Sequence, residues 1–169
     1  MNIALVAHDA RKKELVEWVK YNWAELSNME HKLYATGTTG KLIKQALVEA
    51  HLDSIGIGNY PDEYPARLVA TYDSRVTCLL SGPLGGDQQI GAMIAEGKVD
   101  VLIFFCDNLI VQGHQNDVSA LTRLASLYNI AFATNRTTAD MILTSPLFKD
   151  PHYNRILPTA IENYKNRNI

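Results

Sequence analysis

The chain has 169 residues, a length typical of a single domain with its own core, and 47% of them are hydrophobic against 20% charged, as in ordinary globular proteins. A formal net charge of −2 disfavours a nucleic-acid surface built on bulk electrostatics, but it leaves room for a local basic pocket. No apolar run approaches the roughly 20 residues that a membrane-spanning helix needs, so we expect no membrane segment.

The first residues and the cysteines indicate a cytoplasmic protein. The segment MNIALVAHDARKK carries its charges after the apolar stretch, the reverse of a signal peptide, and it reads as a first strand. Cys78 and Cys106 are the only cysteines, and both lie within or at the end of apolar runs. We therefore expect two buried thiols in a reducing compartment, with no disulfide. The histidines and acids show no metal-ligand spacing, so we expect no metal.

Apolar runs of strand length recur along the chain, and each is followed by a turn and a helical pattern. The runs occupy residues 2–7, 31–36, 76–80, 99–105 and 130–134. The helical patterns follow at residues 11–26, 41–50, 87–97, 117–128 and 137–145. This alternation predicts one α/β domain over residues 1–169, a five-stranded parallel sheet with helices on both faces, in a flavodoxin-like three-layer sandwich. The strands read as continuously apolar, which is typical of burial on both faces.

Two segments depart from this alternation. Residues 51–76 contain prolines and tyrosines without a clean period, and we expect a surface excursion there, with a short helix near residues 65–72. The tail from Pro151 to Ile169 ends polar and is expected to form a short strand or helix packed on the domain or on a neighbouring molecule.

The unusual polar residues of this chain follow the ends of the predicted strands. They are His8, Asp9 and Lys12; Thr36 to Gly40; Ser81 to Asp87; Asp107 to Asp117; and Thr134 with Asn135. In a parallel sheet all carboxyl ends of strands meet at one edge, where ligands bind. We therefore expect these residues to surround one pocket.

The string TGTTG, from Thr36 to Gly40, has the features of an anion-binding loop. Its glycines allow close backbone approach, its hydroxyls can donate, and the amides at the start of the next helix favour negative charge. Lys12 can add a positive charge to a bound phosphate. A plain helix cap explains such a loop equally well when it is taken alone. It lacks the spacing of a Walker A loop, which disfavours a nucleoside triphosphate.

Asp87 and His114 each admit two interpretations. An acid at a helix start is ordinary capping, but Asp87 also follows the turn SGPLGG, from Ser81 to Gly86, in the position of a carboxylate held over a ligand. His114 lies in the polar loop DNLIVQGHQND, where it is either solvated or oriented by Asp107 or Asp117 as a hydrogen-bond donor.

Taken together, these motifs resemble the methylglyoxal synthase family. The resemblance lies in IALVAHD with Lys12, LYATGTTG, LSGPLGGDQQIGA, GKVDVLIFF, the loop from Asp107 through His114 to Asp117, and ATN followed by TAD. These strings span all five strand–turn units in order. Residues 51–76 are longer than expected between the second helix and third strand of this family, and they are interpreted as an insertion.

The resemblance implies a carbon–oxygen lyase that converts dihydroxyacetone phosphate to methylglyoxal and inorganic phosphate through an enediolate, in a bypass of glycolysis, without metal or organic cofactor. It implies a homohexamer that phosphate inhibits. By position, Asp87 becomes the catalytic base and His114 a donor to the substrate oxygens. The implied substrate-binding residues are His8, Lys12, Thr36, Gly37, Thr38, Thr39, Ser81, Gly82 and His114. Asp9, Asp107, Asp117 and Arg167 take supporting positions, with Arg167 reaching across a subunit boundary.

Two other classes of protein share this fold. A non-catalytic regulatory domain that binds a small anion would need the TGTTG loop but has no use for Asp87 or His114. A flavodoxin-like nucleotide or flavin binder is disfavoured by the missing dinucleotide fingerprint.

Overall fold

Five strands form one fully parallel sheet in the computed structural model, which describes residues 1–28, 30–56, 58–109, 113 and 115–167. The strands are β1 (Asn2–Ala7), β2 (Lys32–Thr36), β3 (Val76–Leu79), β4 (Val101–Phe105) and β5 (Ala131–Ala133). Their order across the sheet is β3-β2-β1-β4-β5. All five predicted strands are confirmed, and so is the α/β class.

The helices connect the strands and flank the sheet. Two 3-10 turns, η1 (Asp9–Arg11) and η2 (Gly82–Leu84), follow β1 and β3. The α-helices are α1 (Lys12–Tyr21), α2 (Trp23–Leu26), α3 (Gly37–Ile55), α4 (Tyr64–Arg75), α5 (Gly86–Ala95), α6 (Gln115–Leu127), α7 (Arg136–Thr144), α8 (Pro146–Lys149) and α9 (Thr159–Lys165). Among the described residues, no helix combines the length and the apolar character that crossing a bilayer requires.

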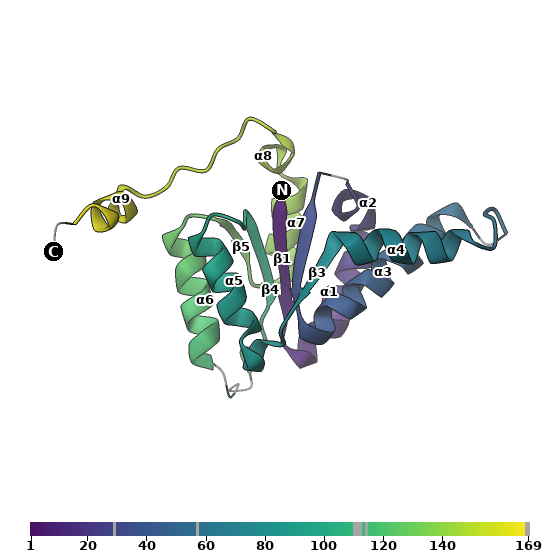
Figure 1. The fold of residues 1–169 in the computed structure, drawn as a ribbon, viewed down its shortest axis with the longest axis horizontal. Helices are drawn as coiled ribbons and strands as arrows, with labels where there is room; N and C mark the ends of the chain where they lie inside the picture. Colours follow the sequence, from purple (N-terminus) through teal and green to yellow (C-terminus); the bar gives the residue numbers. More distant parts are fainter. Residues whose placement is uncertain (29, 57, 110–112, 114, 168–169) are drawn as a thin grey trace.

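Alternate residues of the central strands enter two separate cores. Ile3 and Leu5 of β1 pack with α1, α3, α4 and α7, whereas Ala4 and Val6 pack with α5 and α6. Figure 1 shows α5 and α6 on one side of the sheet and α1, α3 and α4 on the other. The sheet is therefore the middle of three layers, and β1 and β4 are buried on both faces, as their continuous apolar runs predict.

The edge strand β3 is where the burial prediction is wrong. Cys106 is buried as expected, but Cys78 is exposed. Only Val76 of the four β3 residues is buried, because in the described part of the chain β3 pairs with β2 alone. An apolar run indicates that a segment is a strand, but it does not tell which strands lie at the edge.

The predicted excursion over residues 51–76 contains more helix than expected. The helix α3 continues to Ile55, and α4 covers Tyr64–Arg75, longer than the short helix predicted. Leu68 and Tyr72 are the buried residues of α4. The tyrosine hydroxyl of Tyr72 contacts Ser27 Oγ at 2.8 Å and His51 Nδ1 at 3.1 Å, so the polar atoms of this segment also anchor it.

The C-terminal tail forms an extended strap followed by α9. Figure 1 shows the strap leaving α8 and running outward to α9, away from the sheet. Side-chain hydrogen bonds tie it to the body: Arg155 Nη1 donates to the Val99 carbonyl at 2.8 Å, and Asn129 Nδ2 donates to the Ile156 carbonyl at 2.9 Å. Ile156 and Tyr164 remain 81% and 70% exposed, so this segment leaves apolar surface uncovered.

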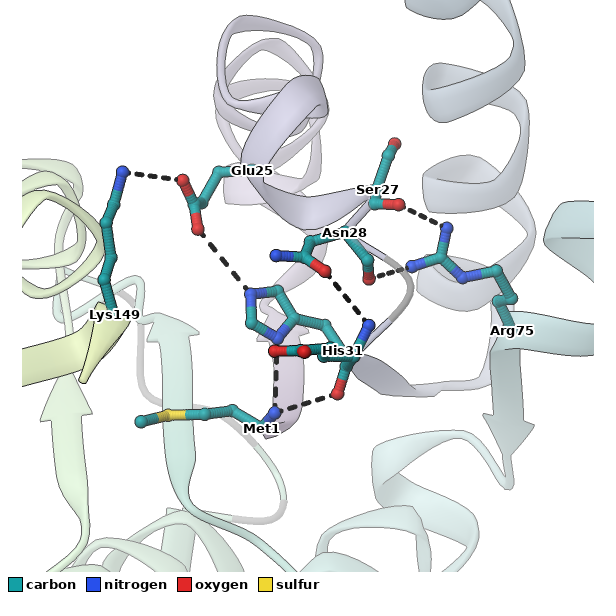
Figure 2. Close-up of polar contacts among 8 residues, drawn as sticks. Met1, Glu25, Ser27, Asn28, His31, Arg75 and Lys149 are labelled. Carbon is teal, nitrogen blue, oxygen red and sulfur yellow. Dashed lines mark hydrogen bonds and ion pairs between the residues drawn. The ribbon is translucent and has the colours of Figure 1, made fainter. Parts of the chain in front are cut away.

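At the amino edge of the sheet, the buried His31 contacts Met1, before β1, and Glu25 of α2, and Glu25 in turn pairs with Lys149 of α8 (Figure 2). The Met1 ammonium donates to the Glu30 carbonyl at 3.0 Å and lies 3.2 Å from His31 Nδ1. His31 Nε2 lies 3.7 Å from Glu25 Oε1, and the other Glu25 oxygen pairs with Lys149 Nζ at 2.9 Å. Burial and the adjacent ammonium lower the pKa of His31, although Glu25 opposes this shift. The folded protein therefore favours neutral His31.

This lowered pKa predicts that acid destabilises the fold. Below about pH 6.5 the unfolded chain takes up a proton on His31 while the folded chain resists it, so the free energy of unfolding falls as the pH falls. Urea unfolding between pH 7.5 and pH 5.5 measures this slope. His31→Gln should make the slope shallower, and His152→Gln, which changes an exposed histidine of the tail, should leave it as in the parent. An unchanged slope in His31→Gln contradicts the prediction.

Candidate active site

The carboxyl ends of the strands enclose a cavity of about 760 Å3. Residues predicted from four of the five strand ends line it: His8, Asp9, Lys12, Thr36, Gly37, Thr38, Thr39, Ser81, Gly82, Asp87 and Asp117. The cavity lies where the chain, having added β2 and β3 on one side of β1, crosses to β4 on the other. Such a switch point is the usual ligand site of an open parallel sheet.

The fifth strand end takes no part in this cavity as the structure describes it. Asn135 is instead the N-cap of α7, and its Oδ1 accepts from the Thr138 amide at 2.9 Å. A second cavity, of about 870 Å3, lies at the amino edge of the sheet. Its charged residues include the Glu25–Lys149 pair and Asp100, which lies 3.7 Å from Arg155. Because the residues predicted from the strand ends line the first cavity, that strand-end cavity is the candidate site.

The first turn of α3 supplies one wall of the cavity. Thr36 is extended, and the helix starts at Gly37, whose amide donates to the Leu80 carbonyl at 3.0 Å. The amides of Thr38 and Thr39 come next, and amides in the first turn of a helix have no partner within that helix. They carry the positive end of the helix dipole of a 19-residue helix, so this wall is suited to an anion.

Lys12 brings a cation to the same wall. Its ammonium lies 2.6 Å from Thr38 Oγ1 and 2.5 Å from Asp9 Oδ1. The Asp9 side chain is 93% exposed and the Lys12 side chain only 23%. Asp9 therefore holds the ammonium from the solvent side, against the start of α3.

Asp87 faces this wall from α5. It is 3% exposed and lies inside the first turn, where Gly85 rather than Asp87 is the N-cap. A Cβ atom on Gly82 would lie 3.0 Å from Asp87 Oδ2, so the carboxylate packs directly against the backbone of the Ser81–Gly86 turn. A buried carboxylate that lines a cavity is a candidate general base, since substrate binding removes its remaining water.

His8 is fixed by a backbone bond. Its Nδ1 accepts from the Asp107 amide at 2.8 Å, and its ring packs edge-on against Phe104 at 5.0 Å between centroids. Neutral His8 therefore carries its proton on Nε2. Asp107 does not line the cavity, and its Oδ1 accepts from the Leu109 amide at 3.0 Å, so it shapes the loop after β4.

The remaining predicted residues differ in how they relate to the site. Asp117 lines the cavity from the first turn of α6. Arg167 does not line it, and its guanidinium stacks on Tyr164 at 4.4 Å. His114 lies outside the described residues.

Some cavity residues were not singled out individually from the sequence, although Pro83, Gly113 and Asn116 fall within the predicted strand-end ranges. Asn116, Pro83 and Phe104 line it, together with Val6, Ala7 and Gly113. Asn116 lies in the first turn of α6, beside Asp117, and the strand-end rule that singled out Asp117 applies to it equally.

A buried thiol adjoins the site but is not suited to nucleophilic chemistry. Cys106 directly follows β4, and burial raises the pKa of its thiol to about 11. The thiol is therefore protonated at neutral pH. Over the described ranges of the chain, no group of three or more histidine, cysteine or acidic residues is arranged to hold a metal ion.

Comparisons with known proteins agree on one family. The model of the MGS-like domain matches residues 66–134. The methylglyoxal synthase of Proteus mirabilis strain HI4320 is 50% identical over 147 residues, which cover 87% of this chain and 79% of that protein. The methylglyoxal synthase of Maridesulfovibrio salexigens is 45% identical over 169 residues, covering 99% of this chain and 97% of the relative. A crystal structure of methylglyoxal synthase from Elizabethkingia anophelis NUHP1 is 39% identical, covers 99% of this chain and 91% of its own, and superposes with a TM-score of 0.74.

Proposed function

Because this chain belongs to the methylglyoxal synthase family, we propose that it converts dihydroxyacetone phosphate to methylglyoxal and inorganic phosphate. The observation that carries the proposal is that the buried Asp87 carboxylate shares one cavity with Lys12 and the first turn of α3. A carboxylate can accept a proton from carbon, while the helix start and the ammonium hold a phosphate. A domain that only sensed a small anion would gain nothing from burying this acid.

The reaction begins with proton transfer to Asp87. Its carboxylate takes a proton from the hydroxymethyl carbon of the substrate, and the carbonyl oxygen becomes the oxyanion of an enediolate. His8, through Nε2–H, and His114 are proposed to donate to the substrate oxygens and stabilise that charge.

Phosphate then leaves. A carbonyl forms at the former hydroxymethyl carbon as its hydroxyl proton passes to the neighbouring oxyanion, and the double bond moves to the carbon that bears phosphate. Phosphate departs with the electron pair of its C–O bond and takes up the proton that Asp87 had removed, so that it leaves as the dianion and the carboxylate is restored. The product is the enol of methylglyoxal, which gains a proton at its terminal carbon and loses its hydroxyl proton to give methylglyoxal.

The anion wall is proposed to control this second step as well as binding. The C–O bond to phosphate breaks fastest when it stands out of the enediolate plane, where it overlaps the π system. Donors from Thr38, Thr39, Ser81 and Lys12 would fix that torsion and stabilise the leaving dianion. The same donors would bind free inorganic phosphate, and we propose that phosphate inhibits the enzyme.

We also propose that the enzyme is a cytoplasmic homohexamer acting in a bypass of glycolysis, in which the tail of one copy completes the site of another. The strap and α9 run outward from the body and leave Ile156 and Tyr164 exposed (Figure 1). Arg167, at the end of that tail, is absent from the cavity of its own chain. A guanidinium from a neighbour would add a further charge for the phosphate.

We propose too that residues 51–76 are an insertion in this family.

Asp87→Asn tests the base directly. The amide is close in size to the carboxylate but cannot accept the proton, so kcat should fall by about 10²- to 10⁴-fold while inorganic phosphate still binds. Phosphate release from dihydroxyacetone phosphate measures turnover, and calorimetry measures phosphate binding. Asp53→Asn makes the same change on an exposed residue of α3 and should leave kcat unchanged. Near-normal turnover in Asp87→Asn would reduce Asp87 to a structural acid.

Lys12→Met tests the anion wall. Loss of a charged donor to phosphate should raise KM for dihydroxyacetone phosphate and the inhibition constant of phosphate together, by about 10- to 100-fold each. Lys13→Met, one position along α1 and exposed, should change neither constant. Equal constants in the Lys12 and Lys13 variants would contradict a phosphate site at this wall.

A complementation experiment tests the shared site. Arg167→Ala and Asp87→Asn should each be nearly inactive alone. When the two chains are co-expressed and mix at random, about one quarter of the sites would combine an intact Asp87 with an intact Arg167 from a neighbour. Activity should therefore return in the mixed oligomer, whose mass light scattering gives. If mixed oligomers form but stay inactive, Arg167 does not act across the interface.

A further inference from the structure

The peptide groups on either side of Leu80 join the two halves of the site. The Leu80 carbonyl accepts from the Gly37 amide at 3.0 Å, which fixes the start of α3 and hence the anion wall. The Leu80 amide donates to the Gln89 side-chain carbonyl, Oε1, at 2.9 Å. Gln89 belongs to α5, the helix that carries Asp87. Leu80 is thus hydrogen-bonded both to the start of α3, which forms the anion wall, and to α5, which carries the candidate base.

Leu80 needs this bond because of its place in the sheet. The β2–β3 ladder ends where Thr36 pairs with Leu79, so Leu80 is the first residue beyond it. On the other side of β3 the described sheet has no further strand. Gln89 supplies the acceptor that another strand would provide elsewhere in the sheet.

The backbone of residues 80 and 81 is in close contact with its neighbours and has little room to move. A Cβ atom on Gly86 would lie 2.1 Å from the Leu80 carbonyl oxygen, and one on Gly37 would lie 2.8 Å from Ser81 Cα. The start of α5 and the start of α3 therefore both touch the backbone of residues 80 and 81. A displacement of the Leu80 peptide would move both helix starts, because each is in close contact with this backbone.

We propose that Gln89 is a positioning residue, whose bond to the Leu80 amide holds the anion wall of α3 and the Asp87 helix at a fixed separation. The proposal rests on the proposed lyase activity of this site. Gln89 is not among the described residues that line the cavity; it acts through Leu80 and Gly37. Small displacements of this kind are costly for a reaction that depends on aligning a base at one end of the substrate and a phosphate at the other.

Gln89→Met tests the bond, because methionine has nearly the same length but cannot accept from the Leu80 amide. Loss of one such hydrogen bond corresponds to about a three- to tenfold effect, and we expect kcat/KM for dihydroxyacetone phosphate to fall by that factor. Both terms should contribute: KM rises because the anion wall moves, and kcat falls because Asp87 moves. The inhibition constant of inorganic phosphate should rise with KM.

Two further variants separate positioning from general damage. Gln88→Met makes the same change on the preceding exposed residue and should keep parental constants. Gln89→Glu retains an acceptor oxygen, and because the position is exposed its added charge is screened, so kcat/KM should recover to within about twofold of the parent. Melting temperatures of all three should agree closely, since Leu80 and Gln89 are exposed.

Three results decide the matter. An active parent whose Gln89→Met variant keeps parental kcat/KM and phosphate inhibition overturns the proposal while leaving the proposed function intact. A Gln89→Glu variant as impaired as Gln89→Met also overturns it. A parent without turnover refutes the proposed function itself, which is a separate outcome from the first two.

Discussion

The parallel pairing of β1 with both β2 and β4 is the constraint from which the site follows. Ala7 lies beside Phe105 at one end of this register, and Leu5 lies beside Ala35. Because all strands run the same way, their polar continuations emerge at one edge, and because the chain reverses direction across β1, the flanking helices diverge there. The cavity between His8, Thr38 and the helix of Asp87 is a consequence of topology before any side chain is considered.

Two helix starts give this cavity its chemistry. The first turn of α3 and Lys12 form a wall suited to phosphate, and α5 holds Asp87 almost fully buried opposite it. An enzyme that forms an enediolate from a triose phosphate can either isomerise it or lose phosphate, and triosephosphate isomerase does the former with a carboxylate and a neutral histidine. The proposed difference lies in the torsion that the phosphate donors impose, so residues that fix the wall relative to Asp87 matter as much as those that touch substrate.

Local patterns predicted the buried parts of this protein well. The apolar runs of β1 and β4 are buried as expected. The failures concern long-range placement. No local signal marks β3 as an edge strand, so the exposure of Cys78 was not predicted. A cap and a ligand look alike in Asn135, and the contact between Tyr72 of α4 and His51 of α3 joins residues that no local pattern relates. Most of the site was predictable because strand ends meet by geometry, and Asn116 falls within the predicted range after β4 together with Asp117.

A crystal structure with an enediolate analogue, in which a hydroxamate replaces the hydroxymethyl ketone and the phosphate is kept, tests the central claim most directly. The phosphate should lie on the amides of Thr38 and Thr39 with Lys12 beside it, and the planar hydroxamate should lie within about 3 Å of the Asp87 carboxylate. A phosphate bound away from the first turn of α3, or a hydroxamate out of reach of Asp87 while the phosphate sits on that turn, would contradict the account.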